Sequence, residues 1–182
     1  MALTLKQTEN PPEAWPESPA GLSAKAAALA AAFIWQRIES YTAYRTTERE
    51  VSWTVEGCGE WVPPLTPATI ATTEIWQADT WQAIELRPSP LGGYVLPGEG
   101  PYRFTGTAGD DEAEVPADLA EAFRRLAEYM AAEVNPDHAG VRVVSESVPD
   151  VFTGSIERSP AWMAQALINS GAADLLRKYR RA

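Results

Sequence analysis

The chain has 182 residues, of which 45% are hydrophobic and 22% charged, and its 25 acidic and 15 basic residues give a net charge of −10. This composition is typical of a folded protein, and a chain of this length is expected to form one domain, with room for extra segments. The negative charge repels phosphate groups and argues against a protein that reads a DNA sequence.

The first 21 residues are predicted to form an arm rather than part of the core. They contain four prolines between positions 11 and 19, a pattern that cannot sustain a helix. From Leu22 the sequence is rich in alanine, Ser23 is a suitable N-cap, and the apolar residues follow a near-helical spacing. These features predict a first helix that ends near Tyr44.

The middle of the chain has the alternation of apolar and polar residues that is typical of strands. Apolar residues at 51, 53 and 55 alternate with polar ones, and Gly57-Cys58-Gly59 supplies a turn before Trp61, which predicts a hairpin. Further short apolar runs flank Asp79-Thr80 and the segment 97–100. Short antiparallel strands joined by tight turns are therefore expected throughout this region.

Two helical segments are predicted in the C-terminal half. After the acidic loop 110–114, Pro116 suits the first turn of a helix whose apolar residues step by three and four from Leu119 onward. The segment 137–158 has no helical period and is predicted to be a long loop or an extended strand. Ser159-Pro160 begins a last helical segment, interrupted at Gly171.

Taken in order, these elements predict an α+β fold that is mostly helical. The expected architecture is a small helical bundle with an inserted set of short antiparallel β-hairpins and an extended C-terminal helical tail. The predicted division is an arm over 1–21, a core over 22–159 and a basic helical tail over 160–182.

Charge is distributed unevenly along the chain. Four of the 15 basic residues lie in the last six positions, so residues 1–176 carry a net charge of −14 and the tail carries +4. A basic tail with an apolar face suits docking to a partner. Cations at the end of a helix also complement its dipole, by about 0.3–1 kcal/mol, so a purely structural role for the tail stays open. Phosphate binding is a third option, less attractive for an acidic protein.

No catalytic, metal or cofactor site is predicted. An enzyme needs a nucleophile with a base or two carboxylates in a cleft, whereas His138 lies in a polar turn and Cys58 lies between two glycines. One cysteine and one histidine exclude an internal disulfide and a zinc site of the usual type. The acidic run 110–114 lacks the spacing of a calcium loop, and the glycines at 92–100 lack that of a phosphate-binding loop.

A membrane association is not expected either. The longest apolar run, 26–35, is about half the length that a bilayer-spanning helix needs, and the N-terminus lacks the pattern of a secretory signal. The sequence therefore predicts a soluble intracellular protein.

Four tryptophans on the predicted strands are candidates for subunit contacts: Trp53, Trp61, Trp76 and Trp81. Buried or interfacial tryptophan is the common case, so some of these rings are expected in the core and others between subunits. A row of exposed rings would instead stack on sugars, which keeps open a carbohydrate-binding module, or a soluble protein-interaction domain, as the alternative function.

The order of the features resembles a known family of virion proteins. An alanine-rich first helix ends with Ile-Glu-Ser-Tyr-Thr at 38–42, a second helix begins with Val-Pro-Ala-Asp-Leu at 115–119, and the last segment runs from Trp-Met-Ala at 162–164 to a Leu-Leu-x-x-Tyr-Arg ending at 175–180. This arrangement, over roughly 22–182, resembles the head-to-tail connector (adaptor) proteins of long-tailed bacteriophages and gene transfer agents.

The resemblance implies a non-enzymatic structural protein of the virion neck, assembled in the host cytoplasm. It implies a dodecameric ring that binds the portal protein on one side and a stopper or tail-completion protein on the other. Genome DNA would pass through the ring without specific binding. The resemblance assigns portal binding to the last residues of the chain, which are Leu175, Leu176, Arg177, Lys178, Tyr179, Arg180 and Arg181.

Overall fold

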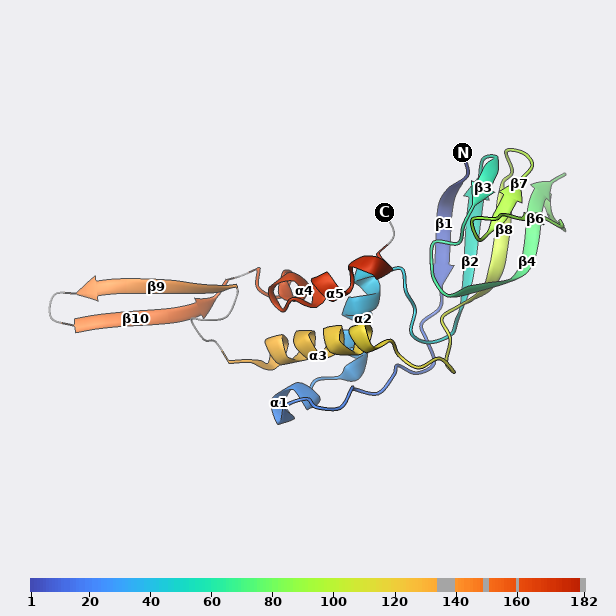
Figure 1. Ribbon diagram of the computed structural model, residues 1–182. Helices are drawn as coiled ribbons and strands as arrows, with labels where there is room; N and C mark the ends of the chain where they lie inside the picture. The colour runs from blue at the N-terminus through green and yellow to red at the C-terminus, as the bar shows by residue number, and fades with distance from the viewer. Residues whose placement is uncertain (134–139, 149–150, 160, 181–182) are drawn as a thin grey trace. The chain divides into compact units, whose positions relative to one another are not determined.

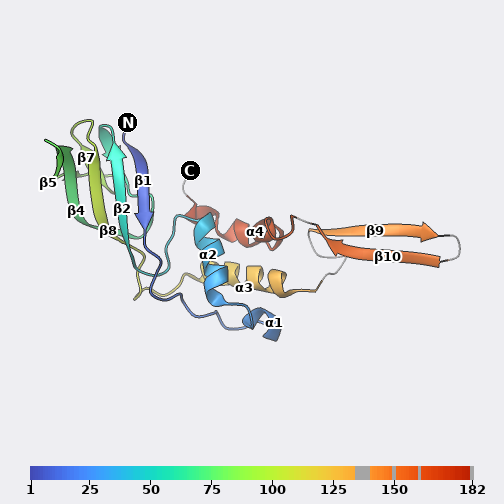
Figure 2. The same cartoon turned by 180° about the vertical axis from the view of Figure 1, so that it is seen from behind.

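The computed structural model describes residues 1–133, 140–148, 151–159 and 161–180, and within them the chain divides into two compact units. The sheet unit consists of Met1–Trp15 and Ala43–Ala113, and the helical unit consists of Pro16–Thr42 and Glu114–Arg180. Each unit is therefore built from two stretches of the chain (Figures 1 and 2). The three-part division into arm, core and tail does not follow these boundaries.

The sheet unit contains one five-stranded and one three-stranded antiparallel sheet. The larger sheet has, in spatial order, β1 (Leu3–Glu9), β2 (Arg49–Glu56), β8 (Tyr102–Ala108), β4 (Ala68–Gln77) and β5 (Thr80–Ala83). The smaller sheet has the order β3 (Gly59–Trp61), β7 (Tyr94–Leu96) and β6 (Arg87–Pro88).

Alternating burial along the central strands produces the core of the sheet unit. In β2 the residues at 49, 51, 53 and 55 are buried and those between them are not, and β8 alternates in the same way. The strands pair so that Trp53 lies opposite Phe104, and Trp61 of the smaller sheet stacks on Phe104 with ring centroids 4.0 Å apart. Because these rings close one shared core, both sheets depend on the same apolar cluster.

The predicted hairpins are confirmed only in part. The strands flanking Asp79-Thr80 do form a hairpin, with Trp76 opposite Trp81 and left-handed backbone at Ala78 and Asp79 in the turn. The turn around Cys58 is present, but β2 and β3 belong to different sheets and do not pair with each other. The predicted hairpin at this turn is therefore wrong, because β2 pairs instead with β1 and β8.

The N-terminal segment contributes a strand. Residues Leu3–Glu9 form β1, an edge strand that pairs with β2 along its length. The prolines that suggested an arm begin only after this strand, at Pro11.

The helical unit contains short helices around one long amphipathic helix. Its elements are α1 (Ala24–Ala27), α2 (Ala31–Tyr41), α3 (Ala117–Ala131), α4 (Ala166–Asn169), α5 (Ala172–Leu175) and the 3₁₀ turn η1 (Arg177–Tyr179). The unit also includes a two-stranded sheet, in which β9 (Val141–Val148) and β10 (Val151–Arg158) pair along all eight residues.

The helix predictions are confirmed with shifted boundaries. Ser23 caps α1, since its hydroxyl accepts a hydrogen bond from the backbone N–H of Ala26 at 3.2 Å. The first helix is interrupted between α1 and α2 and ends at Tyr41. The second follows Pro116 and buries one face, which consists of Leu119, Ala122, Phe123, Leu126 and Ala127.

The expectation of a mostly helical protein with an extended helical tail is wrong. Strands account for more of the described residues than helices do, so the protein is a sheet-rich α+β fold. The C-terminal segment consists of three short turns, α4, α5 and η1, instead of one long helix. Alanine and amphipathic spacing make helices conspicuous in a sequence, whereas short strands with threonine and proline give a weak periodic signal.

Candidate functional site

The C-terminal segment 175–180 packs against the helical unit. Leu176 is fully buried, and the backbone N–H groups of 176, 179 and 180 bond to carbonyls three or four residues earlier. Of the residues expected to bind a portal, Leu176 is thus part of this unit's core, and Arg181 lies outside the described residues.

Asp118, in the first turn of α3, binds two neighbouring side chains of this segment. The hydroxyl of Tyr179 donates to Oδ1 of Asp118 at 2.7 Å, and Nζ of Lys178 lies 2.6 Å from Oδ2. Arg180 also contacts the unit, because it donates to the Tyr41 hydroxyl at 3.2 Å and stacks over that ring at 4.6 Å. The end of the chain is therefore attached to both α2 and α3.

The contacts change the acid–base behaviour of Asp118. Partial burial alone would raise the pKa of this carboxyl, but the hydrogen bonds from Lys178 and Tyr179 outweigh it and hold the pKa below its ordinary value of 3.8. Burial and the hydrogen bond to Asp118 raise the pKa of Tyr179, although Lys178 acts in the opposite direction.

We expect the attachment of the C-terminal segment to weaken in acid. A lowered carboxyl pKa means that the charged form is stabilised by folding, so the contribution is complete above pH 3.8 and is lost as the pH falls through the lowered value. NMR signals of the Tyr179 ring, followed during acidification, should move toward those of an unpacked tyrosine. The variant Asp118→Asn should lack this step, and an unchanged acid transition in that variant would contradict the assignment.

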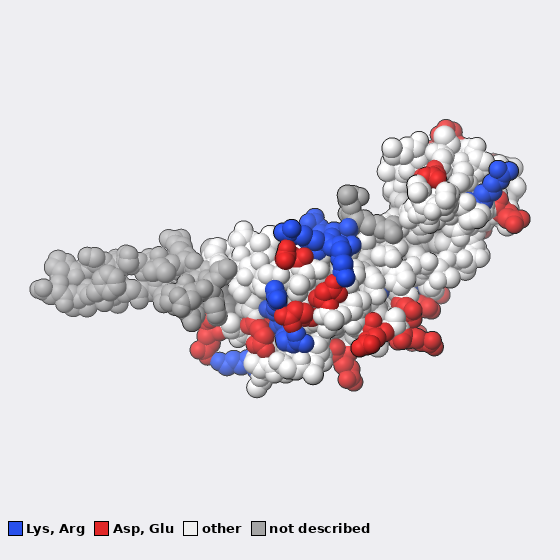
Figure 3. Space-filling model, viewed as in Figure 1, with Lys and Arg blue, Asp and Glu red and all other residues white. Residues whose placement is uncertain are grey.

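Basic side chains of the segment remain available at the surface. The side chains of Arg177 and Lys178 are 79% and 65% exposed. Figure 3 shows lysine and arginine gathered on one face of the helical unit, with acidic side chains among them. Arg177 pairs with Asp174 at 3.1 Å, so part of this charge is neutralised locally.

The four tryptophan candidates fall into two groups. Trp53 and Trp61 are buried in the sheet unit, where their indole N–H groups donate to Gln7 and Thr4. Trp76 is 40% exposed and meets Trp81 across the β4–β5 hairpin, with centroids 5.3 Å apart and ring planes at 64°. Only this second pair reaches the surface, and its tilted rings do not form the flat row that a sugar-stacking platform needs.

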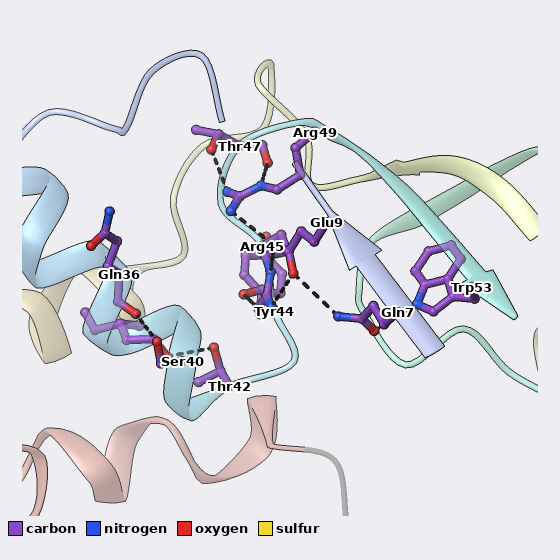
Figure 4. A network of polar contacts seen from close by, with 11 residues as sticks. Gln7, Glu9, Gln36, Ser40, Thr42, Tyr44, Arg45, Thr47, Arg49 and Trp53 are labelled. Atoms are coloured by element: carbon purple, nitrogen blue, oxygen red, sulfur yellow. Dashed lines mark hydrogen bonds and ion pairs between the residues drawn. The ribbon is translucent and has the colours of Figure 1, made fainter. Parts of the chain in front are cut away.

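A cluster of charged side chains, which the sequence did not predict, holds the end of β1. Glu9 binds Arg45 through both of its carboxylate oxygens, at 2.5 and 2.9 Å, and lies 3.3 Å from Arg49 (Figure 4). Arg49 also donates to Thr47 and stacks over Trp15. The arginines are separated from Glu9 by 36 and 40 residues, so no local spacing predicts the cluster.

Neither a cluster of metal-ligating side chains nor a membrane-spanning helix is present in the described ranges. Over residues 1–133, 140–148, 151–159 and 161–180, no three histidine, cysteine or carboxylate side chains are placed to hold a metal ion. Within the same ranges, no helix is both long and apolar enough to cross a bilayer. Cys58 is exposed in its turn, and His138 lies outside the described residues.

Comparison with known proteins gives matches among solved structures. No protein-family model matches the sequence, and no curated protein does so either. A chain in a structure described as the "Neck of empty GTA particle computed with C6 symmetry" aligns with a TM-score of 0.50 and 17% identity, over 98% of this chain and 96% of that one. A chain in the "Neck of native GTA particle computed with C12 symmetry" aligns with a TM-score of 0.44 and 18% identity, over 83% and 79%. GTA denotes a gene transfer agent. The resemblance stated from the sequence is confirmed at the level of the fold, which this chain shares with a chain of such a neck over nearly its whole length.

Proposed function

We propose that the protein is a non-enzymatic structural component of the neck of a tailed phage or gene transfer agent particle. Its subunits form a dodecameric ring that joins the portal to a stopper or tail-completion protein. The ring leaves a channel through which the genome passes. The observation that carries the proposal is the likeness, over nearly the full length of both chains, to a chain of a GTA neck.

The distribution of charge supports a channel that does not hold DNA. The sheet unit contains thirteen acidic and five basic residues, so most of the negative charge of the protein belongs to it. A surface of this kind repels phosphate groups and lets a duplex move past without binding.

A mobility-shift assay tests the charge argument directly. We expect the purified chain to leave duplex DNA unshifted at physiological salt, because specific DNA-binding proteins act at about 10⁻⁸–10⁻¹¹ M and depend on basic surfaces. A shift at submicromolar protein concentration would contradict a passive channel.

Portal binding is assigned to the exposed cations of the C-terminal segment, chiefly Arg177 and Lys178. Many identical weak contacts around a ring add up to a strong joint, so a small loss in each subunit has a large effect on the whole. A deletion from residue 175 would also remove the buried Leu176, so a point variant gives the cleaner test.

The variant Arg177→Glu should therefore reduce co-sedimentation with portal rings by about tenfold or more while leaving the fold intact. Lys25→Glu is the matched control, because Lys25 is 65% exposed, belongs to the same unit and also pairs with a single carboxylate, that of Glu133. Equal retention of Arg177→Glu and the unmodified chain on portal rings would overturn this assignment.

A further inference from the structure

One surface of the helical unit combines exposed apolar groups with two arginines. Ile168 is 68% exposed and Phe33 is 42% exposed. Between α2 and α4 lies a shallow pocket of about 270 Å³, lined by Arg37, Ser40, Tyr41 and Leu167. With Arg180, which stacks on Tyr41, these residues are here called the arginine surface.

The two arginines of this surface have no carboxylate partner within the described part of the chain. Arg37 donates to the carbonyl of Met163 at 2.6 Å and stacks near Phe33, while its Nε is buried without any hydrogen-bond acceptor in the described residues. Among the described side chains, that of Tyr41 is the one to which the Arg180 side chain donates a hydrogen bond and over which it stacks. By contrast, the cations on the neighbouring turns are paired with carboxylates, as are Arg124, Arg125, Arg177 and Lys178.

The complementary feature is the acidic loop 110–114. Its four carboxylates belong to exposed residues, and none forms an ion pair with a described basic side chain. Asp110 and Asp111 accept hydrogen bonds from backbone N–H groups, which holds the loop in shape, whereas no hydrogen bond engages the carboxylates of Glu112 and Glu114 within the described ranges.

We propose that the arginine surface of one subunit binds the acidic loop 110–114 of a neighbouring copy. The inference rests on the proposed ring and specifies its subunit contact. Arginine side chains that pack against apolar groups are well suited to bind carboxylates at interfaces. The opposite charges of the arginine surface and the acidic loop determine that these two surfaces meet. Because the two surfaces are different parts of the same chain, the contact is head-to-tail, which is the kind that closes rings.

The experiment uses paired charge reversals in the whole chain. Sedimentation of the unmodified protein at rising concentration should show self-association that weakens with added salt. We expect Arg180→Glu, and separately the double variant E112K/E114K, to weaken self-association by about tenfold or more. An equimolar mixture of the two variants should restore it, since each then offers the charge that the other lacks.

Arg177→Glu is the control, because it makes the same charge change in the same exposed segment outside the arginine surface. It should weaken portal binding and leave self-association unchanged. If the chain associates but Arg180→Glu associates equally well, or the mixture restores nothing, the inference fails while the proposed function stands. A chain that stays monomeric even when portal rings are present overturns both the ring and its subunit contact.

Discussion

Replacing Trp35 with alanine is expected to destabilise the helical unit by about 3–5 kcal/mol, the range for removal of a large aromatic side chain from a core. Trp35 on α2 is fully buried and packs against Phe123 of α3, with ring centroids 4.8 Å apart. Its indole N–H donates to the carbonyl of Pro16 at 2.9 Å, so the same side chain also holds the segment that leads into α1. The substitution therefore opens a cavity and leaves a carbonyl without its donor.

Urea denaturation followed by circular dichroism measures the loss. Trp76→Ala is the matched control. The ring of Trp76 is 40% exposed, so the same substitution there is expected to lower the free energy of unfolding far less. Trp35→Phe separates the two contributions, since it restores most of the ring volume without the N–H. A midpoint for Trp35→Ala close to that of Trp76→Ala would show that α2 and α3 do not depend on this contact.

The helices were predictable because their signals are local. The stripe from Leu119 along α3 and the serine cap of α1 can be read from adjacent turns of the sequence, and both are present. The alternation in β2 likewise identified a strand with Trp53 on its buried face. Each of these patterns depends on residues within one element.

Strand pairing and the site were not predictable in the same way, because they depend on distant residues. Nothing near Leu3 indicates that residues 3–9 pair with 51–56, and nothing near Tyr179 indicates that its hydroxyl meets Asp118, 61 residues earlier. The basic end of the chain was conspicuous as charge, but its attachment to α2 and α3 followed only from the fold. Sequence composition located the charge and the structure showed which cations are already paired.

Among the charged residues of the sheet unit, Glu9 is the one whose replacement we expect to reduce its stability most. Its carboxylate lies between Arg45 and Arg49, whose side chains are only 11% and 3% exposed. Arg49 is further enclosed by Trp15, over whose ring its guanidinium lies at 5.2 Å. Removal of the Glu9 carboxylate would take this negative charge away from two neighbouring guanidinium groups that have little access to water.

Glu9→Gln is therefore expected to lower the free energy of unfolding by about 3–5 kcal/mol, the range for breaking a buried ion pair by removing one partner. The substitution removes the charge while the side chain keeps nearly the same shape. Glu133→Gln removes an exposed carboxylate from its pair with Lys25, and such surface pairs contribute about 0–1 kcal/mol, so it is the matched control. Urea denaturation of both variants gives the comparison. Because the cluster joins the end of β1 to Arg49 at the start of β2 and to Arg45 before it, the loss should also appear as faster amide exchange along β1. Equal stability of the two variants would mean that the edge strand is held by its backbone pairing alone.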